Sequence, residues 1–361
     1  MSYLILSIIV ISVSYSYDRL RNTEKISKGV KWLFYIAICF SLCLFAGLRT
    51  KYNDTGTYIK LFSETPKKFS NLFSSKISLS EVYLFEFWNY CIYHFISQNA
   101  NVYLFLSSIV FVCPAIYLMG KYSKNFTFSV MLFMFAGMYL FSLAGLKQAM
   151  ATGMVMMAFP SLIKKQYFKY YLFCIFAVGF HSYSILFLVV PLLGEEPFNK
   201  RTVFFCLIAI FIGALMSYFS SVISAVIKLL GKEVSEDTIQ SGSVNILRVV
   251  VFLVPFVLSI CARKKLSALR VEDKVFIKIG MLSSVFMVLA LFGNPILFGR
   301  IPQYFLIGIV VSIPLLIDKA FVAGEQKRVI SIAAFCYIIY GLYGLYTDGA
   351  FTRDIFQLIW F

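Results

Sequence analysis

Long apolar runs are the feature that most constrains how this chain folds. Apolar stretches of about 17–25 residues recur along all 361 residues, and this is the length at which an α-helix crosses a bilayer. Only 14% of the residues are charged and 60% are hydrophobic, which excludes an ordinary soluble domain. The runs do not alternate in polarity as the strands of a membrane β-barrel do. The sequence therefore predicts an all-α polytopic membrane protein, a bundle of about 10–12 transmembrane helices with one or two re-entrant or interfacial segments.

The expected spans follow these apolar runs to within a few residues. We expect one integral membrane domain over residues 1–361, in which residues 49–100 form an outer-face loop with an interfacial or re-entrant helix. The expected spans are 2–17, 31–48, 101–120, 126–143, 149–163, 202–229, 244–261, 274–292, 301–317 and 328–346.

Two further segments are too polar to be simple lipid-facing helices. Residues 81–97 contain two glutamates and a histidine, and residues 168–193 have a glycine, a histidine and a serine in their middle. We expect 81–97 to lie in the interface or to re-enter. We expect 168–193 to enter the membrane and return, with its tip at residues 179–182, because broken backbone at membrane depth must line protein or a water-filled cavity.

The excess of basic residues predicts the orientation. The net charge is +16, from 33 Lys and Arg against 17 Asp and Glu. In a membrane protein such residues gather in cytoplasmic loops, so we do not expect nucleic acid as a partner. The lysines and the arginine of 49–80 break this trend if that segment is outside, and they indicate an anionic ligand there. The segments expected inside are 18–31, 121–124, 164–169, 199–201, 262–270 and 318–328, and those expected outside are 49–80, 144–148, 232–243 and 293–300.

Residues 47–58, which we call the signature segment, place polar groups directly after an apolar run. Arg49, Lys51 and Asp54 are either interfacial anchors with a loop carboxylate or a binding site at the membrane surface, and we favour the site. Asp54 precedes a turn or helix start that would fix its carboxylate. Tyr58 lies four residues later and would share its helix face.

Six further polar residues stand at the ends or breaks of apolar runs. A lysine there either extends to the interface or meets a ligand. A lone histidine in an apolar segment is more often structural than catalytic, yet a neutral imidazole is also a proton acceptor. An arginine at a helix end offers the planar fork that binds phosphate oxygens. The six are Lys147, Gln148, His181, Arg248, Arg300 and Tyr304.

The cysteines carry no sign of metal or disulfide chemistry. All eight lie inside apolar segments, and the sequence holds neither a C-x-x-C motif nor a Cys/His cluster. We interpret them as small buried hydrophobic residues and expect no metal and no cofactor.

Taken together, these motifs resemble the EpsG/Wzy family of bacterial polysaccharide polymerases. The resemblance covers about residues 45 to 315 and rests on the order of the motifs. Two positions depart from the family pattern: a lysine stands at 147 where the family has arginine, and an asparagine stands at 53 where a glycine is often seen. The residues at the family's motif positions are Gly47, Arg49, Asp54, Thr55, Tyr58, Glu81, Tyr83, Leu84, Lys147 (in place of the arginine), Gln148, Ala149, Phe180 to Leu186, Arg300, Tyr304, Phe305 and Pro314.

The resemblance implies a multi-pass glycosyltransferase of the bacterial inner (cytoplasmic) membrane. Such an enzyme polymerises undecaprenyl-diphosphate-linked oligosaccharide repeats at the outer face, giving O-antigen, capsule or exopolysaccharide. Arg49, Lys147 and Arg300 would then bind the diphosphate, and Asp54 or His181 would deprotonate the acceptor hydroxyl. The implied partners are the lipid-linked oligosaccharide, membrane lipid and, as a candidate, a chain-length regulator protein.

A polytopic transporter or flippase of lipid-linked oligosaccharide is the main alternative. Such transporters usually show paired repeats and cations near the midplane, whereas this sequence has no clear repeat and its candidate charges gather at one face. A lipid A–glycan ligase would need a large outer loop between late spans, and a membrane O-acetyltransferase has little support in the sequence. We therefore favour the polymerase.

Overall fold

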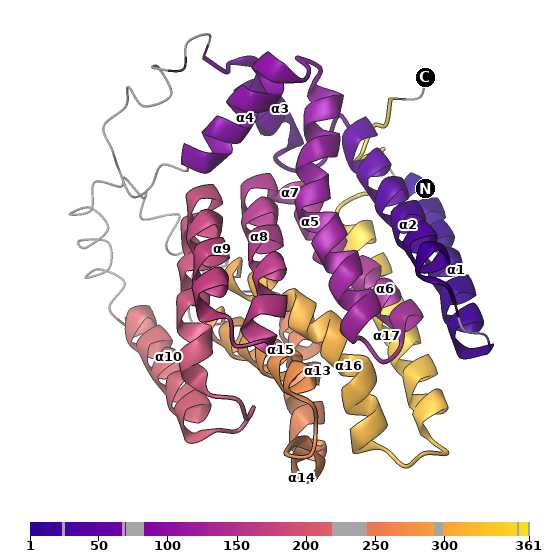
Figure 1. Ribbon diagram of the computed structural model, residues 1–361, viewed down its shortest axis with the longest axis vertical. Helices are drawn as coiled ribbons and strands as arrows, with labels where there is room; N and C mark the ends of the chain where they lie inside the picture. Colours follow the sequence, from indigo (N-terminus) through magenta and orange to yellow (C-terminus); the bar gives the residue numbers. More distant parts are fainter. Residues whose placement is uncertain are drawn as a thin grey trace. The chain divides into compact units, whose positions relative to one another are not determined.

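The structure is a computed structural model, and it describes residues 1–23, 26–66, 69, 83–218, 244–291, 299–351 and 354–359 (Figure 1). Every regular element within these ranges is a helix, which confirms the predicted all-α fold. Three stretches of the expected outer segments lie outside the described residues. They are 232–243, 67–82 apart from residue 69, and 292–298. Judged by length and composition over the described ranges, five helices are able to cross a membrane, or six if a bent pair counts as one span. The chain is therefore a multi-pass membrane protein.

Internal contacts divide the chain into two compact units, Met1–Val189 with Ile330–Phe361 (unit 1) and Val190–Val329 (unit 2). The expectation of one domain over 1–361 stays a prediction. Unit 1 contains α1 (Ser2–Thr23), α2 (Lys28–Leu48), α3 (Thr55–Ser63), α4 (Tyr83–Phe95), α5 (Ala100–Tyr122), α6 (Phe126–Phe135), α7 (Met138–Ala144), α8 (Leu146–Ile163), α9 (Tyr167–Phe180), most of the 3₁₀-helix η2 (Ser182–Leu193) and most of α17 (Gln326–Thr347).

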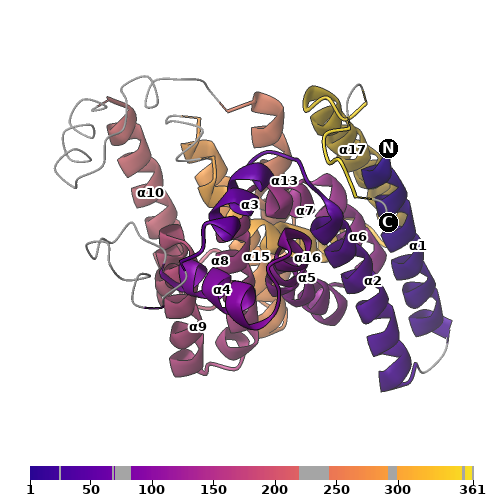
Figure 2. The same cartoon turned by 90° about the horizontal axis from the view of Figure 1, so that it is seen from above.

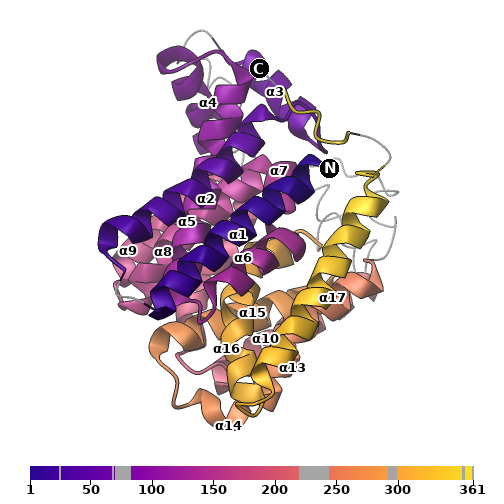
Figure 3. The same ribbon diagram turned by 90° about the vertical axis from the view of Figure 1, so that its right-hand side faces the viewer.

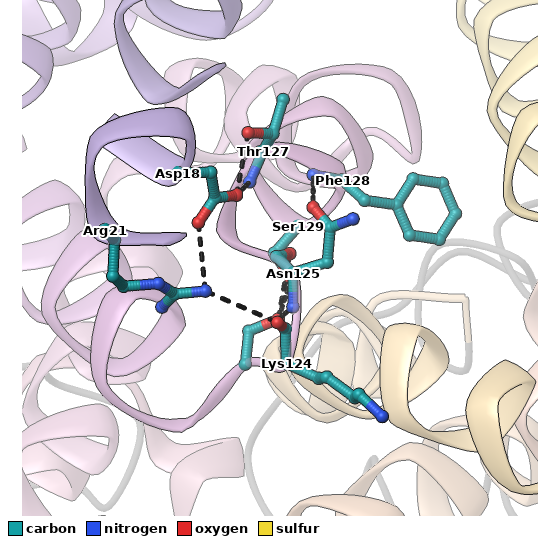
Figure 4. Close-up of polar contacts among 8 residues, drawn as sticks. Asp18, Arg21, Lys124, Asn125, Thr127, Phe128 and Ser129 are labelled. Carbon is teal, nitrogen blue, oxygen red and sulfur yellow. Dashed lines mark hydrogen bonds and ion pairs between the residues drawn. The ribbon is translucent and has the colours of Figure 1, made fainter. Parts of the chain in front are cut away.

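A polar cluster at one end of unit 1 ties α1 to the start of α6 (Figure 4). Asp18 Oδ2 accepts hydrogen bonds from the backbone N–H and the hydroxyl of Thr127, at 2.7 and 2.8 Å. A carboxylate at a helix N-terminus satisfies donors that the helix leaves unpaired. Arg21 pairs with Asp18 at 3.0 Å and donates to the carbonyl of Lys124. The basic segments around Arg21 and Lys124 therefore lie at the same end of unit 1, as expected for two loops that the sequence predicts to be cytoplasmic.

The expected single span 126–143 is broken into α6 and α7, which meet at an angle of 43°. The break falls at Gly137, whose φ of +89° is a left-handed conformation that favours glycine. The Ala136 N–H still bonds to the carbonyl of Leu132, so α6 ends with its last turn closed. A second break at Gly145 separates α7 from α8.

The expected reversal within 168–193 is confirmed. α9 ends at Phe180, His181 is extended, and η2 begins at Ser182. The Tyr170 hydroxyl donates to the carbonyl of Phe187 at 2.7 Å, so η2 runs back alongside α9. Neither arm is long enough to cross alone, since 14 helical residues span about 21 Å and the hydrocarbon core is about 30 Å thick.

The helices α3 and α4 lie across the ends of α8 and α9, at the top of Figure 1 and in front of them in Figure 2. The buried face of α4 carries Phe85, Asn89 and Ile92 at helical spacing. Trp88 donates from its indole nitrogen to Ser107 of α5 at 2.9 Å, which fixes the helix against the bundle. Of the expected segment 81–97, the described residues 83–97 thus cover one end of unit 1 instead of crossing it.

Unit 2 is built around the buried helix α15. A Cβ atom at Gly308 would lie 2.3 Å from the backbone nitrogen of Gly280, so α15 and α16 cross in close contact. Lys274 of α15 pairs with Glu196 at 2.6 Å. Among its described residues, unit 2 contains the helices α10 (Lys200–Tyr218), α13 (Ile246–Cys261), α14 (Arg263–Leu266), α15 (Val271–Leu289), η3 (Ile301–Phe305) and α16 (Leu306–Ala320).

Candidate functional site

The signature segment begins where α2 ends, and the last carbonyls of α2 are capped from three directions. Arg49 bonds to the carbonyl of Ala46, and Asn101 donates from its side chain to the carbonyl of Gly47 at 2.6 Å. The Ile359 N–H donates to the carbonyl of Leu48 at 2.9 Å. The end of a helix leaves its final four carbonyls without partners inside the helix, so these bonds stabilise the end of α2.

Arg49 is fully buried and joins three elements. Its Nε donates to the Thr55 hydroxyl at 3.1 Å, where α3 begins, and one terminal nitrogen donates to the carbonyl of Leu143 in the last turn of α7 at 3.1 Å. Burial lowers the pKa of Arg49 to about 10, which leaves it protonated at neutral pH. Within the described ranges its charge faces helix C-termini, the negative ends of the helix dipoles, and no carboxylate forms an ion pair with it.

Two consecutive residues of the signature segment have left-handed backbone. Tyr52 has φ of +118° and Asn53 has φ of +43°. Such residues cost about 1–3 kcal/mol each and gather at functional sites. Asparagine tolerates this region better than most residues, which explains why it can stand at position 53 where the resemblance has glycine. The conformation is held by Thr55, whose hydroxyl and N–H both donate to the Tyr52 carbonyl, at 2.6 and 3.0 Å.

Residues 354–359, which we call the tail, pair with the start of the signature segment (Figure 3). The N–H of Thr50 donates to the carbonyl of Gln357 at 3.0 Å and the Thr50 hydroxyl donates to it at 2.7 Å. Phe356 is buried and stacks on Tyr52 with ring centroids 4.9 Å apart. The tail is therefore part of the scaffold that shapes this loop.

Asp54 caps the start of α3 by position, as expected from the sequence, but its side chain makes no capping hydrogen bond. Its carboxylate is exposed, as is the ammonium group of Lys51. Tyr58 is buried one turn later and does not share the exposed face of Asp54. The signature segment thus presents one carboxylate and one ammonium group to the surroundings from a backbone fixed by buried groups.

Lys147 opens α8 directly after the break at Gly145, and α4 covers it. Its ammonium lies 4.9 Å from the centre of the Phe85 ring and is attracted by the carboxylate of Glu86. Tyr58 packs edge-on against the Phe85 ring, with the ring centroids 6.0 Å apart. Sequence reasoning missed Phe85, although its place beside the glutamate of a short amphipathic segment was a usable signal.

His181 stands at the turn between α9 and η2. Its ring contacts that of Tyr183, with centroids 5.2 Å apart, and its carbonyl accepts a bond from the Ser184 hydroxyl. A Cβ atom at Gly179 would lie 2.5 Å from Leu84 Cδ1, so α4 packs closely against this turn.

Gln148, the residue that follows Lys147 in α8, is buried.

A second group of cations belongs to unit 2. Arg248 of α13 donates to the carbonyl of Gly299 at 3.0 Å and lies over the Phe252 ring. Arg300 follows Gly299 directly, is exposed, and stands at the start of η3. Tyr304 is fully buried. The structure therefore brings two of the expected arginines next to each other, and it gathers Arg49, Asp54, Tyr58 and Lys147 at one end of unit 1.

This fold and site define a polytopic α-helical membrane protein with a structured polar end. The chain belongs to the EpsG family, whose sequence profile matches residues 32–357 and so includes α17 and part of the tail. No curated protein and no solved structure matches the chain. Membership of the family indicates a role of the polysaccharide-polymerase type.

Proposed function

We propose that this protein is a membrane glycosyltransferase. It polymerises undecaprenyl-diphosphate-linked oligosaccharide repeats at the outer face of the bacterial inner membrane, for O-antigen, capsule or exopolysaccharide. The observation that carries the proposal, beside the family, is the exposed carboxylate of Asp54, presented by a loop whose left-handed backbone is held by buried Arg49 and Thr55.

The reaction needs a base at the acceptor and positive charge at the leaving group. Asp54 takes the proton of the acceptor hydroxyl, whose oxygen then forms a bond to the anomeric carbon of the growing chain. The bond from that carbon to the diphosphate oxygen breaks, and the lipid diphosphate leaves with the electron pair. Lys51 and Lys147 of unit 1 are the cations that we assign to the diphosphate. Diphosphate binding by Arg300, whose loop Arg248 supports within unit 2, stays a prediction from the family resemblance. His181 is the alternative base, and direct diphosphate binding by Arg49 stays a prediction.

Asp54→Asn tests the assignment. This substitution keeps the size of the side chain and removes the base. We therefore expect the rate of polymer formation to fall by a factor of about 10²–10⁴, measured with purified protein and lipid-linked repeats in detergent. Because the side chain is exposed and makes no capping bond, Tm should not change.

The matched control is Glu64→Gln, which alters the exposed carboxylate at the other end of α3. This variant should polymerise as the wild type does. Wild-type glycan ladders from Asp54→Asn would contradict the role of Asp54. Failure of the wild type to extend any glycan in detergent, where no membrane barrier exists, would favour the flippase.

A further inference from the structure

A large apolar groove opens beside the signature segment in unit 1. It has a volume of about 720 Å³, and its walls are the first turns of α1, the last turns of α2, and the turn and tail after α17. Ile5, Ile9 and Leu44 line it, and these side chains are 57%, 47% and 37% exposed. The lining is mostly apolar, with Ser2, Ser41 and Asp354 as its polar members, and this composition favours an aliphatic occupant over a polar one.

The groove extends only a short distance along the axes of α1 and α2. Its lining runs from Ser2, the first residue of α1, to Ile9, about 10 Å along the helix axis, and from Ser41 to Leu48 at the opposite wall. Both stretches lie at the same membrane end as the signature segment, because Leu48 is the last residue of α2. An occupant of the groove therefore lies in one leaflet, with its end at the level of the site.

Leu48 connects the groove to the site. It lines the groove, its carbonyl accepts the tail bond from Ile359, and the next residues of the chain are Arg49 to Lys51. The exposed ammonium of Lys51 thus follows the end of an apolar groove by three residues. An acidic group, Asp354, also stands in the lining, and it disfavours an anion inside the groove itself.

We propose that this groove binds the polyprenyl chain of the lipid-diphosphate-linked glycan and holds the diphosphate at its mouth, level with Lys51. This proposal rests on the proposed function. The arrangement matches a ligand that is aliphatic for most of its length and carries its negative charge at one end. A phospholipid acyl chain is the competing occupant, and the experiment separates the two.

The experiment uses the full-length protein in nanodiscs and a polyprenyl diphosphate with a photoreactive diazirine in an isoprene unit near the diphosphate. After irradiation, mass spectrometry locates the label. We expect it on the first turns of α1, the last turns of α2, or residues 350, 351 and 354–358. Ile9→Trp fills the groove and should lower labelling about tenfold, since it removes contacts with a few methylene groups.

The matched control is Ile8→Trp, which places the same ring on a neighbouring isoleucine that is 66% exposed and outside the groove. The Ile8→Trp protein should be labelled as strongly as the wild type and should have the same Tm. If Ile9→Trp lowers Tm, the groove is filled instead by Leu44→Trp, which lies on the opposite wall. Excess undecaprenyl phosphate should displace the probe.

Three results would overturn the groove as the polyprenyl site. They are label found elsewhere, equal labelling of Ile9→Trp and Ile8→Trp, and displacement of the probe by added phosphatidylglycerol as effectively as by undecaprenyl phosphate. The glycan ladder is measured separately. A wild-type protein that is labelled in the groove but makes no polymer would defeat the proposed function and leave the groove assignment standing.

Discussion

Arg49 carries its charge in the interior of unit 1, where its described partners are carbonyl and hydroxyl oxygens. The two carbonyls are those of Ala46 in the last turn of α2 and Leu143 in the last turn of α7. The guanidinium therefore compensates two helix dipoles at once. Its planar fork reaches these separate oxygens from one rigid group, which a lysine ammonium on a flexible stem does not reproduce.

Arg49→Ala should therefore act on stability as well as on activity. It leaves the carbonyls of Ala46 and Leu143 without a partner, and each buried unsatisfied group costs about 1–3 kcal/mol. We expect a Tm lower by several degrees and loss of polymer. Arg300→Ala should lose polymer at an unchanged Tm, because that side chain is exposed.

Thermal unfolding of the purified variants, beside glycan ladders at matched expression, checks this contrast. Arg49→Lys should lie between the wild type and Arg49→Ala in Tm. An Arg49→Ala protein as stable as Arg300→Ala would show that the caps on α2 and α7 contribute little.

The helix start at Asp54 was predictable, whereas the burial of Arg49 was not. The order Asp-Thr-Gly is a local signal for a turn or an N-cap, and local signals can be followed in a sequence. The burial of Arg49 depends on the last turns of α2 and α7 meeting in space, 94 residues apart along the chain. No local pattern encodes such a meeting.

At the scale of helices, the positions of most spans could be predicted because long apolar runs have few alternatives. The expected 101–120 corresponds to α5, Ala100–Tyr122, and the expected 328–346 to α17, Gln326–Thr347. The bend at Gly137 could not be predicted, since one glycine inside an apolar run is also compatible with a straight helix. The reversal at His181 was predictable because polar residues interrupt a run that basic segments flank on both sides.

Close helix contacts give the next prediction. A Cβ atom at Gly153 of α8 would lie 2.0 Å from the backbone oxygen of Val110 in α5, so Gly153→Ala must push the two helices apart. Overpacking of this kind costs about 1–3 kcal/mol. Gly56→Ala in α3 meets nothing within 4 Å and should raise stability by up to about 1 kcal/mol.

Both substitutions are the same chemical change within a helix, so they control for each other. Tm in one detergent is the measurement, with a decrease expected for Gly153→Ala and none for Gly56→Ala. Equal Tm values for the two variants would mean that α5 and α8 separate without cost.

At the scale of the whole molecule, the basic segments predict which membrane side each loop faces. In unit 1 the contact between Arg21 and Lys124 places two of them together, and the signature segment lies at the opposite end of α2. Positive residues near membrane helices are retained on the cytoplasmic side. The signature segment is therefore expected outside.

Single-cysteine labelling tests this topology in a chain from which the eight native cysteines have been replaced. Lys51→Cys should react with an impermeant maleimide added to intact spheroplasts. Lys265→Cys, in an exposed part of the segment 262–270, should react only after permeabilisation. Labelling of Lys265→Cys from outside would reverse the proposed orientation.

The pairing of the tail with the signature segment also sets an order of events during synthesis. Thr50 and Gln357 are 307 residues apart, and at about 5–20 residues per second the ribosome needs roughly 15–60 s to add the intervening chain. Throughout that time the backbone of residues 48–51 has been synthesised but lacks its final partner. A nascent chain, or one terminated before residue 356, thus inserts its first helices with this loop unpaired, and completion of the loop waits for residues 356–359 to be translated.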